Sequence, residues 1–279
     1  MPELLEQGEE NLEASSMGWT LRVATQPVLK AAVETLVSEE TLQWPLKVLN
    51  AADLGCGTGQ NTFLVLSTVK ETLRRKCREL RYELPDVQIY LNDLPGNDFN
   101  SLFRDIPRYD RDDLDGDDDD GLIRCFVMGA PGSFHGRLFP SSSLHLVHSN
   151  FGVHWLSKTP PALTTDKGLP VNKGKIYISM TSPMIVSQAY LDQFHEDFTM
   201  FLQSRSTEML PNGRMVLILH GRLPADPTLE TETNVDSHIV WEQLAEAIFQ
   251  LVSEGLIEEA KLESFNVPYY IATADKCEQ

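Results

Sequence analysis

Clustered cysteines, long apolar runs and positive charge are all scarce in this 279-residue sequence. The cysteines, Cys56, Cys77, Cys125 and Cys277, are scattered without metal-site spacing, a pattern typical of reduced thiols in a cytosolic protein. No apolar run approaches the roughly 20 residues that span a bilayer. Residues 1–16 are acidic and lack the apolar core of a secretory signal. The sequence therefore predicts a soluble cytoplasmic protein with no membrane partner.

Positive charge is outnumbered, with 23 lysines and arginines against 41 aspartates and glutamates, which gives a formal net charge of −18. Phosphate backbones are repelled by such a balance, so nucleic acid is not an expected partner. Much of the excess lies in DRDDLDGDDDD at 110–120, which at first sight resembles a calcium loop. With Gly116 at the sixth loop position, Arg111 and Leu122 fall where the first and last acidic ligands belong. We interpret this run as a solvated surface loop.

The most informative stretch that is present is LNAADLGCGTGQNTFLVL at 49–66. An apolar run leads to Asp53 and then to Gly55, Gly57 and Gly59, and a helical apolar pattern follows. The pattern predicts a strand, a tight glycine turn and a helix, which together let a ligand lie against bare backbone. Such a turn serves either a dinucleotide or S-adenosylmethionine. The G-x-G-x-G spacing differs from the dinucleotide fingerprint G-x-G-x-x-G, so it favours S-adenosylmethionine and leaves a nicotinamide-dependent oxidoreductase as an alternative.

Strand and helix patterns alternate along the rest of the chain. Further strands are expected at 87–96, 122–134, 144–156 and 214–221, and helices at 17–36 (interrupted near Pro27), from 62 to about 82, at 189–205 and at 241–254. This alternation predicts an α/β fold with a doubly wound, Rossmann-like parallel sheet and a partial helical cap. We expect a disordered tail at 1–16, a cofactor-binding core at 17–222 that includes a cap helix around 183–210, and a truncated helical cap at 223–279.

Polar side chains follow the predicted strand ends, where ligands of parallel sheets bind. Asp93 can accept hydrogen bonds from both ribose hydroxyls of S-adenosylmethionine, with Leu94 beside the adenine. Ser133 and Phe134 can flank the adenine, while Asp53 and Asn61 can bind the amino-acid tail. The alternative interpretations are that Asp93 forms a turn and that Phe134 is a core ring.

Longer motifs add a resemblance to a known family. ADLGCGTGQNT, LNDLPGNDFNSLF, APGSFHGRLFP and SLHLVHSNFGVHWLSKTP resemble, in order, signature blocks of the SABATH family of plant carboxyl and N-methyltransferases. The match continues to about Tyr270. It implies methyl transfer from S-adenosylmethionine to the carboxylate of a small plant acid, although some members methylate xanthine nitrogens. The residues that it implies for the cofactor are Asp53, Asn61, Asp93, Leu94, Ser133 and Phe134; for the acceptor, Phe151, His154 and Trp155; and for magnesium, Asn172, Glu263, Phe265 (through its carbonyl) and Asn266.

The implied mechanism depends on positioning. A carboxylic acid is already ionised at pH 7, so we expect no residue that acts as a general base, and orientation towards the sulfonium methyl supplies the catalysis. His154 and the indole N–H of Trp155 are donors that could hold the carboxylate. The alternative interpretation is that His154 and Trp155 are a pair of core residues at the end of a strand.

Two departures from the family pattern qualify these expectations. The family's SYAxNSxxQ segment is SMGWTLRVATQ here, which keeps Gln26 as an acceptor-binding residue and puts Trp19 in the tyrosine position. Full-length members continue beyond the point where this sequence stops, so we expect residues 215–220 to form an exposed apolar edge strand. A second copy of the chain could cover this edge in a homodimer. The same departure makes a non-catalytic or weakly active protein that still binds the cofactor a further alternative.

Overall fold

The computed structural model describes residues 25–38, 46–58, 61–110, 123–179, 181–221 and 237–272. The predicted tail at 1–16, Gly59 and the aspartate-rich run from 111 onwards lie outside the described residues.

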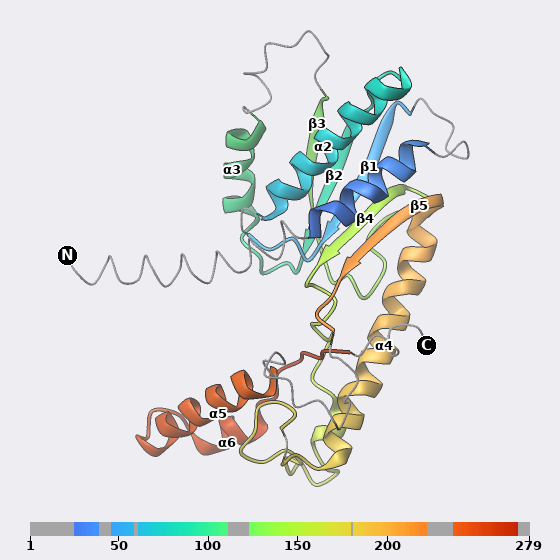
Figure 1. Ribbon diagram of the computed structural model, residues 1–279. Coiled ribbons are helices and arrows are strands. Elements are labelled where there is room, and N and C mark those ends of the chain that lie inside the picture. The colour runs from blue at the N-terminus through green and yellow to red at the C-terminus, as the bar shows by residue number, and fades with distance from the viewer. Residues whose placement is uncertain are drawn as a thin grey trace, which may run out of the picture. The chain divides into compact units, whose positions relative to one another are not determined.

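A parallel five-stranded sheet forms the centre of the fold, in the order β3-β2-β1-β4-β5 (Figure 1). Its strands are β1 (Val48–Leu54), β2 (Asp86–Asp93), β3 (Cys125–Pro131), β4 (Leu144–Asn150) and β5 (Met209–Ile218). The first strand, β1, lies in the middle of the sheet. β2 and β3 follow on one side of it, and β4 and β5 lie on the other side. This confirms the predicted doubly wound α/β fold and places the topological switch point between β1 and β4.

The described helices are a helix over 25–38, which precedes β1; α2 (Asn61–Leu80), α3 (Phe99–Asp110), the 3-10 turn η2 (Pro161–Leu163) and α4 (Met184–Glu208), which lie between strands; and α5 (Ser237–Ser253) and α6 (Glu259–Ser264), which follow β5. Pro27 lies in the first turn of the first of these helices, and residues 17–24 of the helix predicted at 17–36 lie outside the described residues.

The core against the sheet follows from two periodicities. Alternate strand residues such as Ile89 and Leu91 join one buried cluster with Leu29 and Val33 of the helix over 25–38, and with Leu66 and its helical neighbours on α2. Figure 1 shows these two helices lying across the same face of the sheet. Each fully buried side chain of this size contributes about 1.5–3 kcal/mol. The packing holds the start of α2, and with it the glycine turn, against the ends of β1 and β2.

Internal contacts divide the chain into two units, each with its own core. The first comprises Met1–Val153 with Phe201–Ile218 and contains the sheet; the second comprises His154–Met200 with Leu219–Gln279. The second unit's core includes Leu156, Tyr177, Tyr190, Phe194 and Tyr270. Residues 17–222, predicted as one core, are therefore shared between the two units.

The edge strand β5 and the described helices bear on the remaining expectations. Among the described residues β5 pairs with β4 alone, so it is the outer strand of the described sheet. A homodimer through this edge stays a prediction, as does the cytoplasmic location. None of the described helices combines the length and apolar character that a membrane crossing needs.

Candidate active site

The glycine turn after β1 is tied to the end of β2 by main-chain and carboxylate hydrogen bonds. The amides of Gly55 and Cys56 both donate to the carbonyl of Asn92 at 2.9 Å. The amide of Gly57 donates to Oδ2 of Asp93 at 2.7 Å, and that of Leu94 donates to Oδ1 at 2.7 Å. A carboxylate offers about four acceptor positions, so Asp93 keeps capacity for both hydroxyls of a ribose.

Backbone conformation explains the glycines of the turn. Gly55 and Gly57 have φ values of +71° and +64°, which only glycine adopts without strain. A Cβ on Gly55 would lie 3.4 Å from the Cα of Gly152 and 3.6 Å from Cε1 of Phe134. The turn, the segment after β4 and the Phe134 ring therefore meet at one point.

The predicted adenine contacts stand beside this turn. Ser133 and Phe134 follow β3, with Ser133 exposed and Phe134 half-buried. Leu94 is 59% exposed, so its apolar side chain is available to a ligand. The structure thus brings Asp93, Leu94, Ser133 and Phe134 to neighbouring strand ends, as the sequence predicts.

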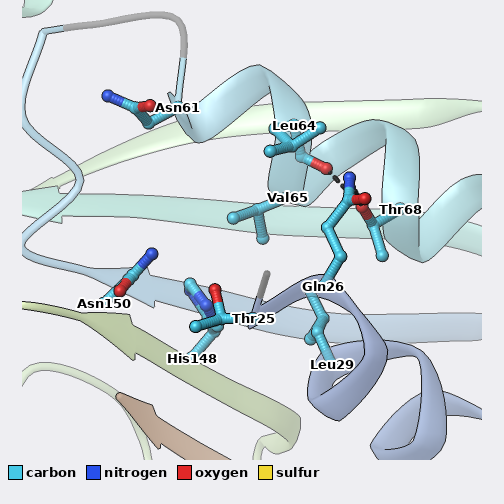
Figure 2. A pocket seen from close by; sticks show the side chains of 9 residues that line it. All are labelled: Thr25, Gln26, Leu29, Asn61, Leu64, Val65, Thr68, His148 and Asn150. Atoms are coloured by element: carbon cyan, nitrogen blue, oxygen red, sulfur yellow. Dashed lines mark hydrogen bonds between the residues drawn. The ribbon is translucent and has the colours of Figure 1, made fainter. Parts of the chain in front are cut away.

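A small pocket opens beside the switch point (Figure 2). Its lining side chains come from the helix over 25–38, the first turns of α2 and the end of β4: Thr25, Gln26, Leu29, Asn61, Leu64, Val65, Thr68, His148 and Asn150. Nε2 of Gln26 donates to Oγ1 of Thr68 at 3.1 Å. Gln26, predicted for the acceptor, and Asn61, predicted for the cofactor, therefore share one pocket within the first unit.

His148 is a residue of this pocket that the sequence reasoning missed. Strand register sets it opposite Asp53, and its Nδ1 lies 2.7 Å from Oδ1 of Asp53, with both residues buried. The sequence carried one signal for this residue, because the polar ring of His148 stands two residues before the end of the largely apolar strand LHLVHSN.

The chain turns sharply after β4. Phe151 has a φ of +56°, an uncommon conformation for a non-glycine residue, and its amide donates to the carbonyl of Ile218 at 2.9 Å. A Cβ on Gly152 would lie 2.8 Å from Oγ of Ser149. The turn ends β4 at Asn150, earlier than the predicted strand at 144–156, and holds the Phe151 backbone in a strained conformation of the kind that clusters at functional sites.

His154 belongs to the second unit and is 1% exposed. Its Nε2 accepts the amide N–H of His220 at 2.8 Å, and its carbonyl accepts the amide of Tyr270 at 2.9 Å. Burial, together with the smaller effect of the neighbouring His220, lowers the pKa of His154 to about 4. The ring is therefore neutral at pH 7, with its proton on Nδ1.

Tyr269 lies beside His154 and two tryptophans in the second unit. The Tyr269 ring lies 5.4 Å from His154, 5.1 Å from Trp155 and 5.9 Å from Trp241 between centroids. Trp155 is 48% exposed and forms an isolated bridge with Tyr269. Burial raises the pKa of Tyr269, so its phenol remains a donor. This group offers flat apolar faces with a few neutral polar atoms.

The residues predicted for magnesium come together only in part. Nδ2 of Asn172 donates to the carbonyl of Tyr177 at 3.0 Å and to Oδ1 of Asn266 at 3.3 Å. Oδ1 of Asn172 accepts from Ser182 at 2.8 Å. Their amide oxygens are thus used within the protein.

The remaining two predicted ligands also lack the features of a metal site. Glu263, the carboxylate of the set, lies 3.8 Å from Nζ of Lys173, and Phe265 is half-exposed. Among the described residues no group of three or more histidine, cysteine, aspartate or glutamate side chains could hold a metal ion. As placed, these groups do not fit Mg²⁺, which needs near-octahedral oxygen ligands, and we assign no step to a metal.

Comparisons with known proteins agree with this arrangement. The family model for SAM-dependent carboxyl methyltransferases matches residues 10–279. A probable caffeine synthase 2 from Camellia sinensis is 54% identical over 262 residues, covering 94% of this chain and 68% of that protein. A 3,7-dimethylxanthine N-methyltransferase from the same plant is 52% identical over 269 residues, covering 96% and 69%.

A solved structure supports the fold as well. A loganic acid methyltransferase with SAH superposes with a TM-score of 0.76 at 32% identity, covering 92% of this chain and 68% of that one. These findings confirm the SABATH resemblance and S-adenosylmethionine as the cofactor, in place of the nicotinamide alternative. The chain therefore belongs to the family of S-adenosylmethionine-dependent carboxyl methyltransferases, the SABATH family.

Proposed function

We propose that this protein transfers the methyl group of S-adenosylmethionine to a ring nitrogen of a xanthine-type acceptor. Two relatives that are more than half identical to it are named as a probable caffeine synthase and a dimethylxanthine N-methyltransferase. This acceptor differs from the small carboxylic acid that we expect from the sequence.

The observation that carries the proposal is that Nε2 of His154 accepts a main-chain N–H, with the rings of Tyr269 and Trp155 beside it. A carboxylate acceptor is held best by charged or strongly donating groups. With a pKa of about 4, His154 carries no charge at pH 7, and its Nε2 already accepts a main-chain N–H. The aromatic faces of Trp155 and Tyr269 suit a flat heteroaromatic ring. These properties favour an uncharged purine over an anion.

The cofactor-binding residues are proposed from their positions. Asp93 accepts the ribose hydroxyls, Leu94, Ser133 and Phe134 contact the adenine, and the turn of Gly55 and Gly57 lies against the cofactor. Asp53 and Asn61 serve the amino-acid tail. Gln26, Phe151, His154 and Trp155 remain our predicted acceptor contacts.

The chemistry requires alignment more than proton transfer. A lone pair of the ring nitrogen attacks the methyl carbon while the S–CH₃ bond breaks, and its electron pair stays on sulfur to give neutral S-adenosylhomocysteine. The N–H proton of the acceptor leaves to water. Holding nitrogen, carbon and sulfur in line can supply about 7–11 kcal/mol in favourable cases, so no residue need act as a base or nucleophile.

Methylation of a carboxylate is the second candidate. It is favoured by the description of the family model and by the loganic acid methyltransferase structure. In that case the indole N–H of Trp155 would be a donor to the acceptor, because Nε2 of His154 accepts a main-chain N–H and cannot itself donate.

One experiment separates these candidates. Labelled S-adenosylmethionine is incubated with the protein and a panel of 7-methylxanthine, 3,7-dimethylxanthine, benzoate and loganic acid, and the products are treated with mild alkali. N-methyl products keep the label, whereas methyl esters release it as methanol. Alkali-stable label on a xanthine supports the proposal, and label only in esters overturns it. Transfer to none of the panel, with S-adenosylhomocysteine still bound, would favour the non-catalytic alternative.

A further inference from the structure

Both polar main-chain groups of Gly57 are held by the two ends of one neighbouring turn. Its N–H donates to Oδ2 of Asp93 at 2.7 Å, and its carbonyl accepts from Nδ2 of Asn97 at 3.0 Å. A carbonyl oxygen can only accept, so the amide nitrogen of Asn97 must face it. Because peptide bonds are planar, only the φ and ψ bonds of Gly57 separate these two groups, and a hydrogen bond at each end fixes both angles.

Asn97 is itself held in place on either side. Its N–H donates to the carbonyl of Leu94 at 2.9 Å, which closes a β-turn with proline and glycine at its centre. The next residue, Asp98, accepts the amide and the hydroxyl of Ser101 at 3.0 and 2.6 Å and so caps α3. The main chain of Asn97 is therefore already ordered, and its side chain loses little conformational entropy when it binds Gly57.

The surroundings of Gly57 leave it room to move. A Cβ placed on this residue would meet no atom of the described residues within 4 Å, and its φ is one that glycine enters and leaves without strain. Cys56 before it is anchored separately, because its amide donates to the carbonyl of Asn92 and its carbonyl accepts from Oγ1 of Thr62, each at 2.9 Å. The hydrogen bonds from the neighbouring turn are thus what restrains Gly57.

Gly57 in turn orients the carboxylate of Asp93. Oδ1 accepts the amide of Leu94 and Oδ2 accepts that of Gly57, so two N–H groups set the plane of the carboxylate. The Leu94 amide belongs to the adjacent residue, whereas the Gly57 amide comes from the end of a different strand. Without the Gly57 amide, the carboxylate could rotate about its last side-chain bond, a torsion with a broad energy minimum.

We propose that Asn97 is a positioning residue for the cofactor. By holding the carbonyl of Gly57, it keeps the Gly57 N–H on Asp93 and so keeps the carboxylate turned towards the ribose. The inference rests on the proposed ribose contact of Asp93, and it requires no contact between Asn97 and the cofactor.

The test uses calorimetry without any acceptor to compare S-adenosylhomocysteine with its 2′,3′-dideoxy analogue, which lacks both ribose hydroxyls. Asn97→Ala should weaken S-adenosylhomocysteine about three- to tenfold, the contribution of one hydrogen bond, and leave the analogue within about twofold of wild type. Asn100→Ala, at an exposed position of α3, is the matched control and should leave both affinities unchanged. Equal weakening of the two ligands by Asn97→Ala, or no weakening, would overturn the proposal. Equal binding of the two ligands by the wild-type protein would instead refute the ribose contact of Asp93, and the proposal with it.

A second variant guards against a general effect of shortening the side chain. Asn97→Asp keeps the size and the turn preference of asparagine but presents an oxygen to the Gly57 carbonyl in place of a donor. Its added charge acts on the two ligands alike, so the ratio of their affinities still reports on the ribose. That ratio should fall at least as far as in Asn97→Ala, and a wild-type ratio would contradict the proposal.

Amide hydrogen exchange of the free protein tests the contact directly. The Gly57 amide should exchange on the order of tenfold faster in Asn97→Ala, whereas the Gly55 amide, which donates to Asn92, should keep its wild-type rate. Equal acceleration at both amides would show a general loosening of the turn and refute the positioning role. Because neither cofactor nor acceptor is present, this result stands apart from the outcome of the methyl-transfer assay.

Discussion

Arg205 and Glu208 form an ion pair on the last turn of α4 with neither side chain exposed. Nε of Arg205 donates to Oε2 of Glu208 at 2.8 Å, and Nη2 lies 2.7 Å from the same oxygen. Burial lowers the pKa of Arg205, and the carboxylate of Glu208 opposes that effect.

The pair also fixes the loop that carries the predicted adenine contacts. Arg205 donates to the carbonyls of Phe134 and Gly136 at 2.8 and 2.9 Å. Oε1 of Glu208 accepts the amides of Leu138 and Phe139 at 2.6 and 3.0 Å. The last turn of α4 therefore fixes the position of the loop that carries Phe134.

Glu208→Gln should destabilise the protein by about 3–5 kcal/mol, because it leaves the Arg205 charge buried without its partner. Urea unfolding followed by circular dichroism measures this. Glu196→Gln on the same helix is the matched control: Glu196 pairs with Lys158 at 3.7 Å with both side chains half-exposed, so its loss should cost at most about 1 kcal/mol. Similar losses in the free energy of unfolding for the two variants would contradict the expected difference between a buried and a half-exposed ion pair.

Asp93→Asn should weaken S-adenosylhomocysteine by about a hundredfold or more, since hydrogen bonds to a charged group contribute about 1.5–3 kcal/mol each and two ribose hydroxyls are involved. Calorimetry gives the dissociation constants. Asp98→Asn is the control, because Asp98 contacts Ser101 on α3 and should not affect the cofactor. Near-wild-type affinity in Asp93→Asn would refute the ribose assignment.

Stability should fall as the pH falls from 6.5 towards 4, because the unfolded chain then protonates His154 and the folded protein does not. The sign follows from the lowered pKa: the stabilisation is complete above 6.5, and about 2 kcal/mol of it is lost by pH 5. Buried His145, whose pKa is also lowered by burial, adds an effect of the same sign. His154→Gln should flatten the pH profile of the unfolding free energy relative to wild type; parallel profiles would show that His154 titrates normally.

Removing divalent ions should change neither the melting temperature nor methyl transfer, because the oxygens of Asn172 and Asn266 are used in hydrogen bonds within the protein. Thermal unfolding with a chelator and with added magnesium tests this. A rise in melting temperature on adding magnesium, abolished in Asn266→Ala, would instead establish the magnesium site.

Local spacing was enough to predict the strand, glycine turn and helix around Gly55, since apolar periodicity and glycine reflect short-range sterics. The polar residues at strand ends, such as Asp93, followed from the topology of a parallel sheet. α3 was not predicted because Pro107 lies inside it and breaks its helical pattern. β4 was predicted too long because apolar residues continue after Phe151, where the backbone takes a positive φ.

The sequence by itself determined the alternating α/β order, the glycine turn and the family motifs, because each depends on residues close together in the chain. Only the tertiary structure decided that Asp53 faces His148, that His154 is neutral and that Arg205 anchors the Phe134 loop. Partners in these contacts come from distant segments, and burial, which sets their protonation and their strength, arises only when those segments pack together.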